Sequence, residues 1–358
     1  MSQNTIIVDA YDENCVHSLS EALKIVPEGG TILIKKGFYK EGLLEIDRPI
    51  TIIGERDELY GDYPVIYCKD GAFIELYAAA TIKDLVVTSE AAMNNFANAL
   101  MYPDDEKIYY NSPLSFTLCE AIHIMANATL SNVSIIGWGF NGIGIGIKGA
   151  KNIINPVIES CRICNNRGTG ISIENGAKGT IKHCEIYGNE KAGILIQNTD
   201  SDPRLIECDI HHNLYGLWIY NEAKSMVEHC QIHDNELSGI NINDNKTSLQ
   251  ATSCQIHSNF WGIGISDGAT AIIGNSDIFK NEGENIKIKN NETNLHISKC
   301  NIRYGNKGLS ISDGATCRIE DCDISKNKHG NICKIDSDNA RKNIFSKLLN
   351  LFSLNKKK

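Results

Sequence analysis

The chain has 358 residues, of which 42% are hydrophobic and 22% charged, and its formal net charge is −9 at pH 7. This mildly acidic composition is typical of a soluble protein and gives no general attraction for nucleic acid or anionic membranes, so we expect no nucleic-acid partner. No stretch approaches the ~18 apolar residues that cross a bilayer, and the first residues lack the basic and apolar regions of a secretion signal, which favours a cytoplasmic location.

The first predicted element is a helix over residues 18–26. Ser18 and Glu21 stand at the spacing of a capping box, and Leu19 and Ala22 begin an apolar stripe on one helical face. We expect this helix to cover the first turn of the fold that follows. Short runs of alternating and β-branched residues then predict strands at 31–35, 50–53, 73–76, 82–87 and 122–135.

Residues 89–116 interrupt this pattern between two of the predicted strands. Insertions between the strands of a repeat fold loop out of the stack and often line a binding surface. We therefore expect an inserted loop here, with Tyr109 and Tyr110 as candidate ligand contacts.

A repeat of 23 residues occupies residues 161–335. Its first marker is a Gly-Ile or closely related pair that begins at positions 170, 193, 216, 239, 262, 285 and 308. Short period-two segments broken by Gly and Asn predict strands and exclude helices. Three such strands per repeat close into one triangular coil. The sequence therefore predicts an all-β fold, a single-stranded right-handed parallel β-helix of roughly 11–12 coils over residues 1–338.

The second marker of the repeat is Cys-x-Ile, followed three residues later by asparagine. Most repeats contain one of the chain's thirteen cysteines at this place, and equivalent positions stack, so we interpret them as small buried residues. By strand alternation, Cys161 points inward and Cys164 outward. Asparagine tolerates a left-handed backbone and can bond to its equivalents in neighbouring coils, which predicts a stack at a sharp turn. Its members are Asn166, Asn189, Asn213, Asn235, Asn259, Asn281 and Asn327.

Outward residues beside the Cys-x-Ile marker form rows of titratable side chains along one face. Glu185, Asp209, His211 and His233 gather within a few coils, and Asp209 and His211 leave the same face of one strand. Because a histidine oriented by a carboxylate is suited to acid–base chemistry, these four are the candidate catalytic residues. Two other interpretations stay open: polar positions spread by duplication, or stacked histidines that chelate a divalent metal. We assign no metal and no cofactor.

Three further outward side chains on the repeats are candidate ligand contacts. Arg162 and Tyr187 extend the rows of the acid–base candidates. Trp218 should point outward from its strand, where an exposed indole suits stacking on a sugar ring or a protein. The expected partner is therefore a polysaccharide or a protein.

The last segment, residues 339–358, has the pattern of a basic amphipathic helix. The end of a solenoid exposes core residues and unpaired strand edges, so it needs a cap. Two roles stay open for this segment: a cap on the last coil, or peripheral contact with a membrane or a partner.

The N-terminal part resembles the opening of pectinesterases and other pectin-lyase-like proteins, and the resemblance is carried by residues 19–23, 30–41, 50–55 and 81–87. Residues 118–335 are similar to the β-helix repeats of F-box-type ubiquitin ligase subunits, SHC-binding spindle proteins and the copper-maturation protein of nitrous oxide reductase. These resemblances imply a right-handed parallel β-helix. They imply little about chemistry, because this fold hosts esterases, lyases, epimerases, hydrolases and binding modules.

The catalytic motifs of pectinesterases and the clustered carboxylates of pectate lyases are not recognisable in this sequence. We therefore predict a non-catalytic scaffold that recognises a protein or glycan along one sheet face. The alternative is a polysaccharide-active enzyme, a lyase, hydrolase or epimerase, that uses the Asp/His cluster of the middle coils.

Overall fold

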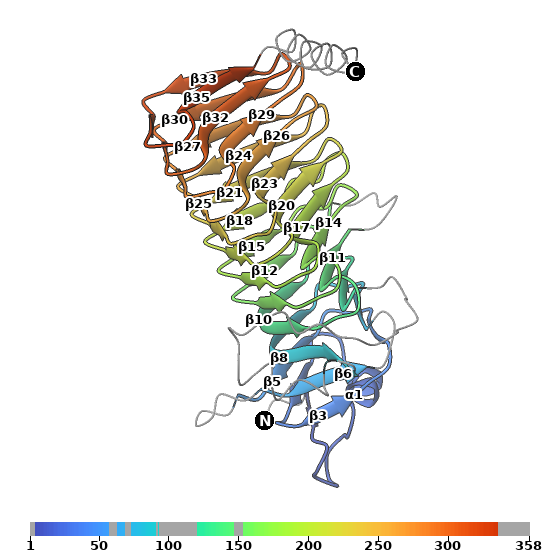
Figure 1. The fold of residues 1–358 in the computed structure, drawn as a ribbon. Helices are drawn as coiled ribbons and strands as arrows, with labels where there is room; N and C mark the ends of the chain where they lie inside the picture. The colour runs from blue at the N-terminus through green and yellow to red at the C-terminus, as the bar shows by residue number, and fades with distance from the viewer. Residues whose placement is uncertain are drawn as a thin grey trace, which may run out of the picture.

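The computed structural model describes residues 4–56, 63–68, 73–90, 92, 120–146 and 153–335. The chain winds into a parallel β-solenoid of about 12 turns, and Figure 1 shows the turns stacked in chain order from one end to the other. The predicted right-handed parallel β-helix is thus confirmed. Tyr109, Tyr110 and the predicted tail at 339–358 lie outside the described residues, as does most of the insertion at 89–116.

The strands form two parallel sheets, one of 23 strands and one of 12. The larger sheet has two tracks that meet at a corner. Its first track comprises β1 (Thr5–Val8), β2 (Thr31–Ile34), β5 (Thr51–Gly54), β8 (Thr81–Ser89), β10 (Thr129–Ile136), β12 (Val157–Glu159), β15 (Thr180–Lys182), β18 (Arg204–Ile206), β21 (Lys224–Glu228), β24 (Ser248–Thr252), β27 (Thr270–Gly274), β30 (Asn294–Ser298) and β33 (Thr316–Glu320).

The second track of the larger sheet comprises β3 (Phe38–Lys40), β6 (Val65–Cys68), β13 (Arg162–Cys164), β16 (Glu185–Tyr187), β19 (Asp209–His211), β22 (Gln231–His233), β25 (Gln255–His257), β28 (Asp277–Phe279), β31 (Asn301–Arg303) and β34 (Asp323–Ser325). The long strands β8 and β10 pair with members of both tracks. The 12-stranded sheet comprises β4 (Leu44–Ile46), β7 (Ile74–Leu76), β9 (Ile122–Ile124), β11 (Ile143–Ile145), β14 (Ile171–Ile173), β17 (Ala192–Gln197), β20 (Tyr215–Tyr220), β23 (Ser238–Ile242), β26 (Trp261–Ile265), β29 (Glu284–Ile288), β32 (Lys307–Ser312) and β35 (Ile332–Ile335).

Single residues in the left-handed conformation turn the chain at the corner between the two tracks. His183 (φ 53°), Glu207 (φ 50°) and His229 (φ 55°) hold this place in successive coils. A second left-handed residue follows the second track, for example Asp234 (φ 51°) and Ser258 (φ 55°). Because each corner takes one residue in every coil, the outward side chains next to it stay in register.

Ladders of identical residues fill the interior. Ile163, Ile186 and Ile210 are register partners that are each 0% exposed, and burying each such side chain contributes about 1.5–3 kcal/mol. The cysteines of the predicted ladder form no disulfides, and all of them are buried except Cys322, which is partly exposed. Burial raises the pKa of the Cys254 thiol to about 12, so this thiol packs as a neutral group. Cys164 lies outside the Ile ladder, as predicted, but it is buried in a small cluster with Ile136 and others.

The predicted N-terminal helix is α1 (Leu19–Ile25), which lies at the blue end of Figure 1. Its residues Leu19 and Ala22 are buried in the core, and the Ser18 hydroxyl caps the helix by accepting the Glu21 amide at 3.2 Å. The carboxylate of Glu41, itself buried, accepts the Leu19 amide at 2.5 Å. The first coil is therefore closed by a helix that is anchored to it. No helix within the described ranges is both long and apolar enough to cross a membrane.

The predicted asparagine stack is confirmed, and one exchange of residues interrupts its regularity. The coil at 300–305 has glycine, Gly305, where the stack needs an asparagine, and Asn285 stands where most of the other repeats have glycine. The Asn285 side chain fills the vacant place. Its Oδ1 accepts from Asn281 Nδ2 at 2.8 Å, and its Nδ2 donates to Asn327 Oδ1 at 3.0 Å.

Restoring the repeat at one of these two positions alone should destabilise the protein. In Gly305→Asn, the new Cβ would lie 2.7 Å from the Asn285 side chain, and Asn285→Gly would remove the bridge, each at a cost of about 1–3 kcal/mol. The double variant should recover most of that loss. Urea unfolding of the three variants measures the coupling, and simple addition of the two losses would contradict the exchange.

Candidate active site

Five rings stack along the second track of the larger sheet. Tyr187, His211, His233, His257 and Phe279 are register partners on β16, β19, β22, β25 and β28. Their ring centroids lie 5.0, 5.0, 5.0 and 4.7 Å apart, with interplanar angles between 4° and 25°. This row, called the imidazole stack below, follows from strand register, because one position repeated on strands ~4.8 Å apart places ring on ring.

Charged side chains run beside the imidazole stack. Arg162 Nε donates to Glu185 Oε2 at 3.0 Å, and Glu185 Oε1 lies 3.8 Å from His211 Nε2. His211 and then Arg162 lower the pKa of Glu185. The structure thus brings together six of the predicted site residues: Arg162, Glu185, Tyr187, Asp209, His211 and His233.

Two carboxylates hold the His233 imidazole. Its Nε2 lies 2.9 Å from Asp209 Oδ1, and its Nδ1 lies 2.6 Å from Asp234 Oδ2. The bond to Asp209 raises the pKa of His233 against the effect of burial, and Asp234 adds to the rise. Burial acts to raise the pKa of Asp209, but the bond and charge of His233 outweigh it, so that pKa is lowered. His233 is therefore set up to hold a proton.

In the next coil, the surroundings of His257 shift its pKa in the opposite direction. Burial lowers its pKa, and the neighbouring charge of His233 lowers it further. Its Nδ1 lies 3.1 Å from Ser258 Oγ, while no described residue forms a hydrogen bond with its Nε2. No role was predicted for His257 from the sequence, although its place in the repeat matches that of His211 and His233. One sequence feature distinguishes the two histidines. Gln231 occupies the position at which the preceding coil has Asp209, so His257 lacks the carboxylate that pairs with His233.

The pair of Asp209 and His233 should stabilise the fold in a defined pH range. Because folding raises the pKa of His233, the pair contributes to the free energy of unfolding at pH values below ~6.5, the pKa of the unfolded state. This contribution is lost as the pH rises through the pKa of the folded state. Because folding lowers the pKa of Asp209, the pair also contributes to stability at pH values above ~3.9, the pKa of the unfolded state. This contribution is lost as the pH falls through the pKa of the folded state.

We therefore expect His233→Phe, which keeps a ring in the stack, to destabilise the protein most between about pH 4 and 6.5. The difference in the free energy of unfolding between this variant and the wild type should shrink by about 1 kcal/mol or less as the pH rises to 9, as for other partly exposed ion pairs. Urea midpoints of both proteins across this range measure it. A difference that does not change with pH would contradict the pairing.

The sequence model of a family described as "Right handed beta helix region" matches residues 120–273 and 261–346. The chain belongs to this family. Among solved structures, this β-helix protein is similar to the A-module of mannuronan C-5 epimerase AlgE4 from Azotobacter vinelandii. The two share 15% identity with a TM-score of 0.65, over 86% of this chain and 91% of that one.

Two other similar structures have related names. The periplasmic alginate epimerase AlgG is 14% identical with a TM-score of 0.55, over 89% of this chain and 84% of that one. The catalytic domain of a GH87 α-1,3-glucanase, solved with tetrasaccharides, is 12% identical with a TM-score of 0.56, over 93% and 69%. These structures are polysaccharide-active enzymes, and at such identities the likeness to this β-helix protein shows the fold alone.

Trp218 lies on a different surface from the imidazole stack. It belongs to β20 of the 12-stranded sheet, half-buried beside Tyr215 and Tyr220, whose ring centroids are 5.1 and 5.2 Å away. Its Nε1 donates to Asn243 Oδ1 at 2.9 Å. The predicted contacts of this β-helix protein therefore fall on two faces. Across the described ranges, no three His, Cys, Asp or Glu side chains come together as a metal site would require.

Proposed function

We propose that this β-helix protein is a polysaccharide lyase that cleaves an acidic glycan laid across the imidazole stack. The observation that carries the proposal is the contrast between His233 and His257, whose rings stack at 5.0 Å while their pKa values are shifted in opposite directions. Neighbouring groups with separated pKa values form an acid and base pair that works near neutral pH. The similar structures support the enzymatic alternative over the non-catalytic scaffold.

The chemistry is a β-elimination that needs no further reactant. The base is His257, whose Nε2 takes the proton from the sugar carbon next to the carboxylate. The electron pair of that C–H bond forms a double bond to the adjacent carbon, and the glycosidic C–O bond of that carbon breaks. The leaving oxygen takes a proton from Nδ1 of His233, where it displaces Asp234, a side chain that is 45% exposed.

This arrangement favours elimination over the two other reaction classes. A hydrolase of the common type needs a protonated carboxyl group as its acid, but Glu185 and Asp209 both have lowered pKa values. An epimerase must take a proton from one face of the sugar and return one to the other. His233 and His257 project from the same face of one sheet, so both reach the same side of a bound chain.

A lyase also needs a cation close to the carboxylate of its substrate, because proton removal builds negative charge there. Lys280 follows Phe279 directly and is exposed next to the upper end of the imidazole stack. Arg303 is the register partner of Phe279 in the next coil. Both cations lie on the His257 side of the stack, where the proton would be removed.

The test is incubation of the protein with a panel of acidic and neutral polysaccharides while the ultraviolet absorbance of unsaturated uronates is followed. We expect absorbance to rise only with acidic chains, together with new chain ends. Chain cleavage without unsaturated products would replace the lyase by a hydrolase. Binding without any cleavage would return the protein to the class of recognition scaffolds.

A second candidate function, glycan recognition on a face that takes no part in cleavage, is supported by the surface around Trp218. The rings of Tyr215, Trp218 and Tyr220 gather on one strand, and Tyr220 and Gln197 join their polar ends. Partly exposed aromatic rings beside amides suit stacking on a sugar. Trp218→Ala should then reduce binding of long chains and leave cleavage of short ones unchanged. Loss of cleavage in this variant with unchanged binding would contradict the separation of the two faces.

A further inference from the structure

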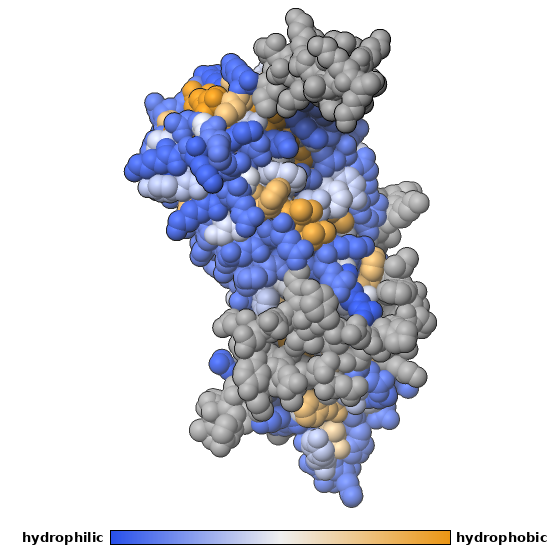
Figure 2. Space-filling view, viewed as in Figure 1, coloured by the Kyte–Doolittle hydropathy of each residue, from blue (hydrophilic) through white to orange (hydrophobic). Residues whose placement is uncertain are grey.

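The two ends of the solenoid differ in how they are covered. At the first coil, α1 buries Leu19 and Ala22 against the core. At the last coil, β33, β34 and β35 each pair with a strand on one side, and no described strand pairs with the other side. Figure 2 shows hydrophobic atoms at this end of the molecule. The described residues thus leave one end of the core without a cover.

The exposed apolar residues of the last coil are core residues by position. Ile332 is the register partner of Leu309, and Leu309 is 0% exposed while Ile332 is 49% exposed. Ile319 is the partner of Ile297, and their exposed fractions are 37% and 0%. The same ladder position is buried in one coil and open in the next, so a cover that supplies apolar contacts is missing from the described residues.

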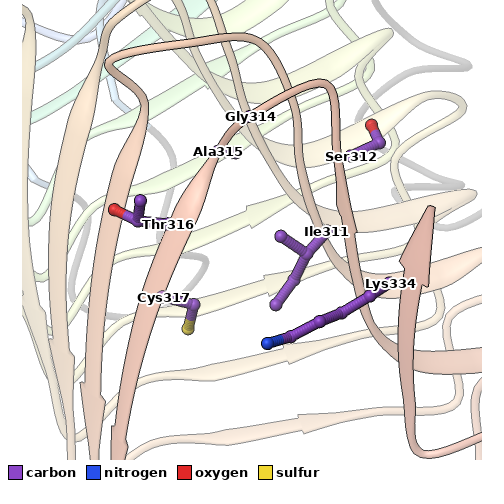
Figure 3. Close-up of a pocket in the computed structure, with 7 residues that line it drawn as sticks. All are labelled: Ile311, Ser312, Gly314, Ala315, Thr316, Cys317 and Lys334. Atoms are coloured by element: carbon purple, nitrogen blue, oxygen red, sulfur yellow. The ribbon is translucent and has the colours of Figure 1, made fainter. Parts of the chain in front are cut away.

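A hollow of about 340 Å³ opens at this end. Figure 3 shows the side chains of Ile311, Cys317 and Lys334 pointing toward the same space between β32, β33 and β35. Burial raises the pKa of the Cys317 thiol to about 11, so this group is neutral near pH 7 and suits an apolar occupant. The ammonium of Lys334 sits at the same hollow and fits an occupant that brings polar groups to its edge.

The chain that continues from this end has the pattern of such an occupant. Ile344, Phe345, Leu348, Leu349 and Phe352 recur at the spacing of one helical face. Lys347 falls between them on the polar side. Because the segment follows directly after β35, its local concentration at the last coil is high, and docking there needs little further association free energy.

We infer that residues 339–358 cover the last coil and lay this apolar face over Ile319, Ile332 and the hollow at Cys317. The cover ends the core as α1 does at the other end, and it prevents the edge strands β33, β34 and β35 from pairing with a second copy of the chain. The inference does not depend on the proposed lyase activity.

The test uses the full-length chain and follows alkylation of individual cysteines by peptide mass spectrometry. Leu348→Asp/Phe352→Asp should raise the alkylation rate of Cys317 about tenfold or more, because it removes the cover. Lys347→Asp, on the polar side of the same segment, is the matched control and should leave the rate unchanged. Cys15, a partly exposed thiol near the other end of the molecule, is the internal reference that should react equally in all variants.

If circular dichroism shows that the double substitution disturbs folding, a second measurement tests the same contact between the tail and the last coil. Leu348→Cys should form a disulfide with a cysteine of the last coil under mild oxidation, whereas Lys347→Cys should not. Equal alkylation of Cys317 in all variants would overturn the inference. So would protection of Cys317 that depends on protein concentration, which indicates a second copy, or protection gained only with anionic vesicles, which indicates a membrane contact.

Discussion

Asn235→Leu is expected to lower the free energy of unfolding by about 3–6 kcal/mol, since it leaves several buried polar groups without partners. The Asn235 amide is 2% exposed and lies in the middle of the asparagine stack. Its Nδ2 donates to His233 O at 3.0 Å and to Asn259 Oδ1 at 2.9 Å. Its Oδ1 accepts the backbone N–H of Asn213 at 3.0 Å. Leucine has a similar volume but satisfies none of these groups.

The matched control is Gln250→Leu, which removes an amide of similar polarity from an exposed position on β24. It should change stability by less than about 0.5 kcal/mol. Urea unfolding followed by circular dichroism compares the two variants with the wild type. If Asn235→Leu also lost less than about 1 kcal/mol, the asparagine stack would be a consequence of the turn and not a source of stability.

The fold could be predicted because every coil repeats the same local rules. The Gly-Ile pairs, the Cys-x-Ile marker and the following asparagine fix register, and register alone places Asn235 beside Asn213 and Asn259. The exchange of Gly305 and Asn285 was not predicted. In the sequence, each of the two residues is only a departure from the repeat. That Asn285 replaces the missing asparagine becomes visible only when three stacked coils are compared.

The candidate site was predicted less completely than the fold. Strand alternation placed Asp209, His211 and His233 on one face, and the structure agrees. Sequence reasoning could not separate the roles of His233 and His257, because protonation depends on which carboxylate meets which ring nitrogen. Trp218 was predicted to point outward as a ligand contact, but the sequence did not show on which face, because outward directions differ between the sheets of a three-sided coil.

His257→Phe is expected to reduce lyase turnover by about 10²- to 10⁴-fold, the usual contribution of a general base. Phenylalanine keeps an aromatic ring between His233 and Phe279, which stack on His257 at 5.0 and 4.7 Å. It removes both ring nitrogens: Nε2, which has no hydrogen-bond partner among the described residues, and Nδ1, which lies 3.1 Å from Ser258 Oγ at a partly exposed position. The unfolding midpoint should therefore stay close to that of the wild type, while the proton acceptor is lost.

His229→Asn is the control for loss of an exposed imidazole on the same part of the surface. His229 stands at the left-handed corner (φ 55°), a conformation that asparagine also tolerates. Turnover by the His229→Asn variant should match that of the wild type within about twofold, since a surface substitution of this kind rarely changes the rate of the chemical step. The measurement is initial rate of unsaturated product formation from an acidic polysaccharide at saturating concentration. Full activity in His257→Phe would exclude His257 as the base, and equal loss in both variants would place the effect in folding instead of chemistry.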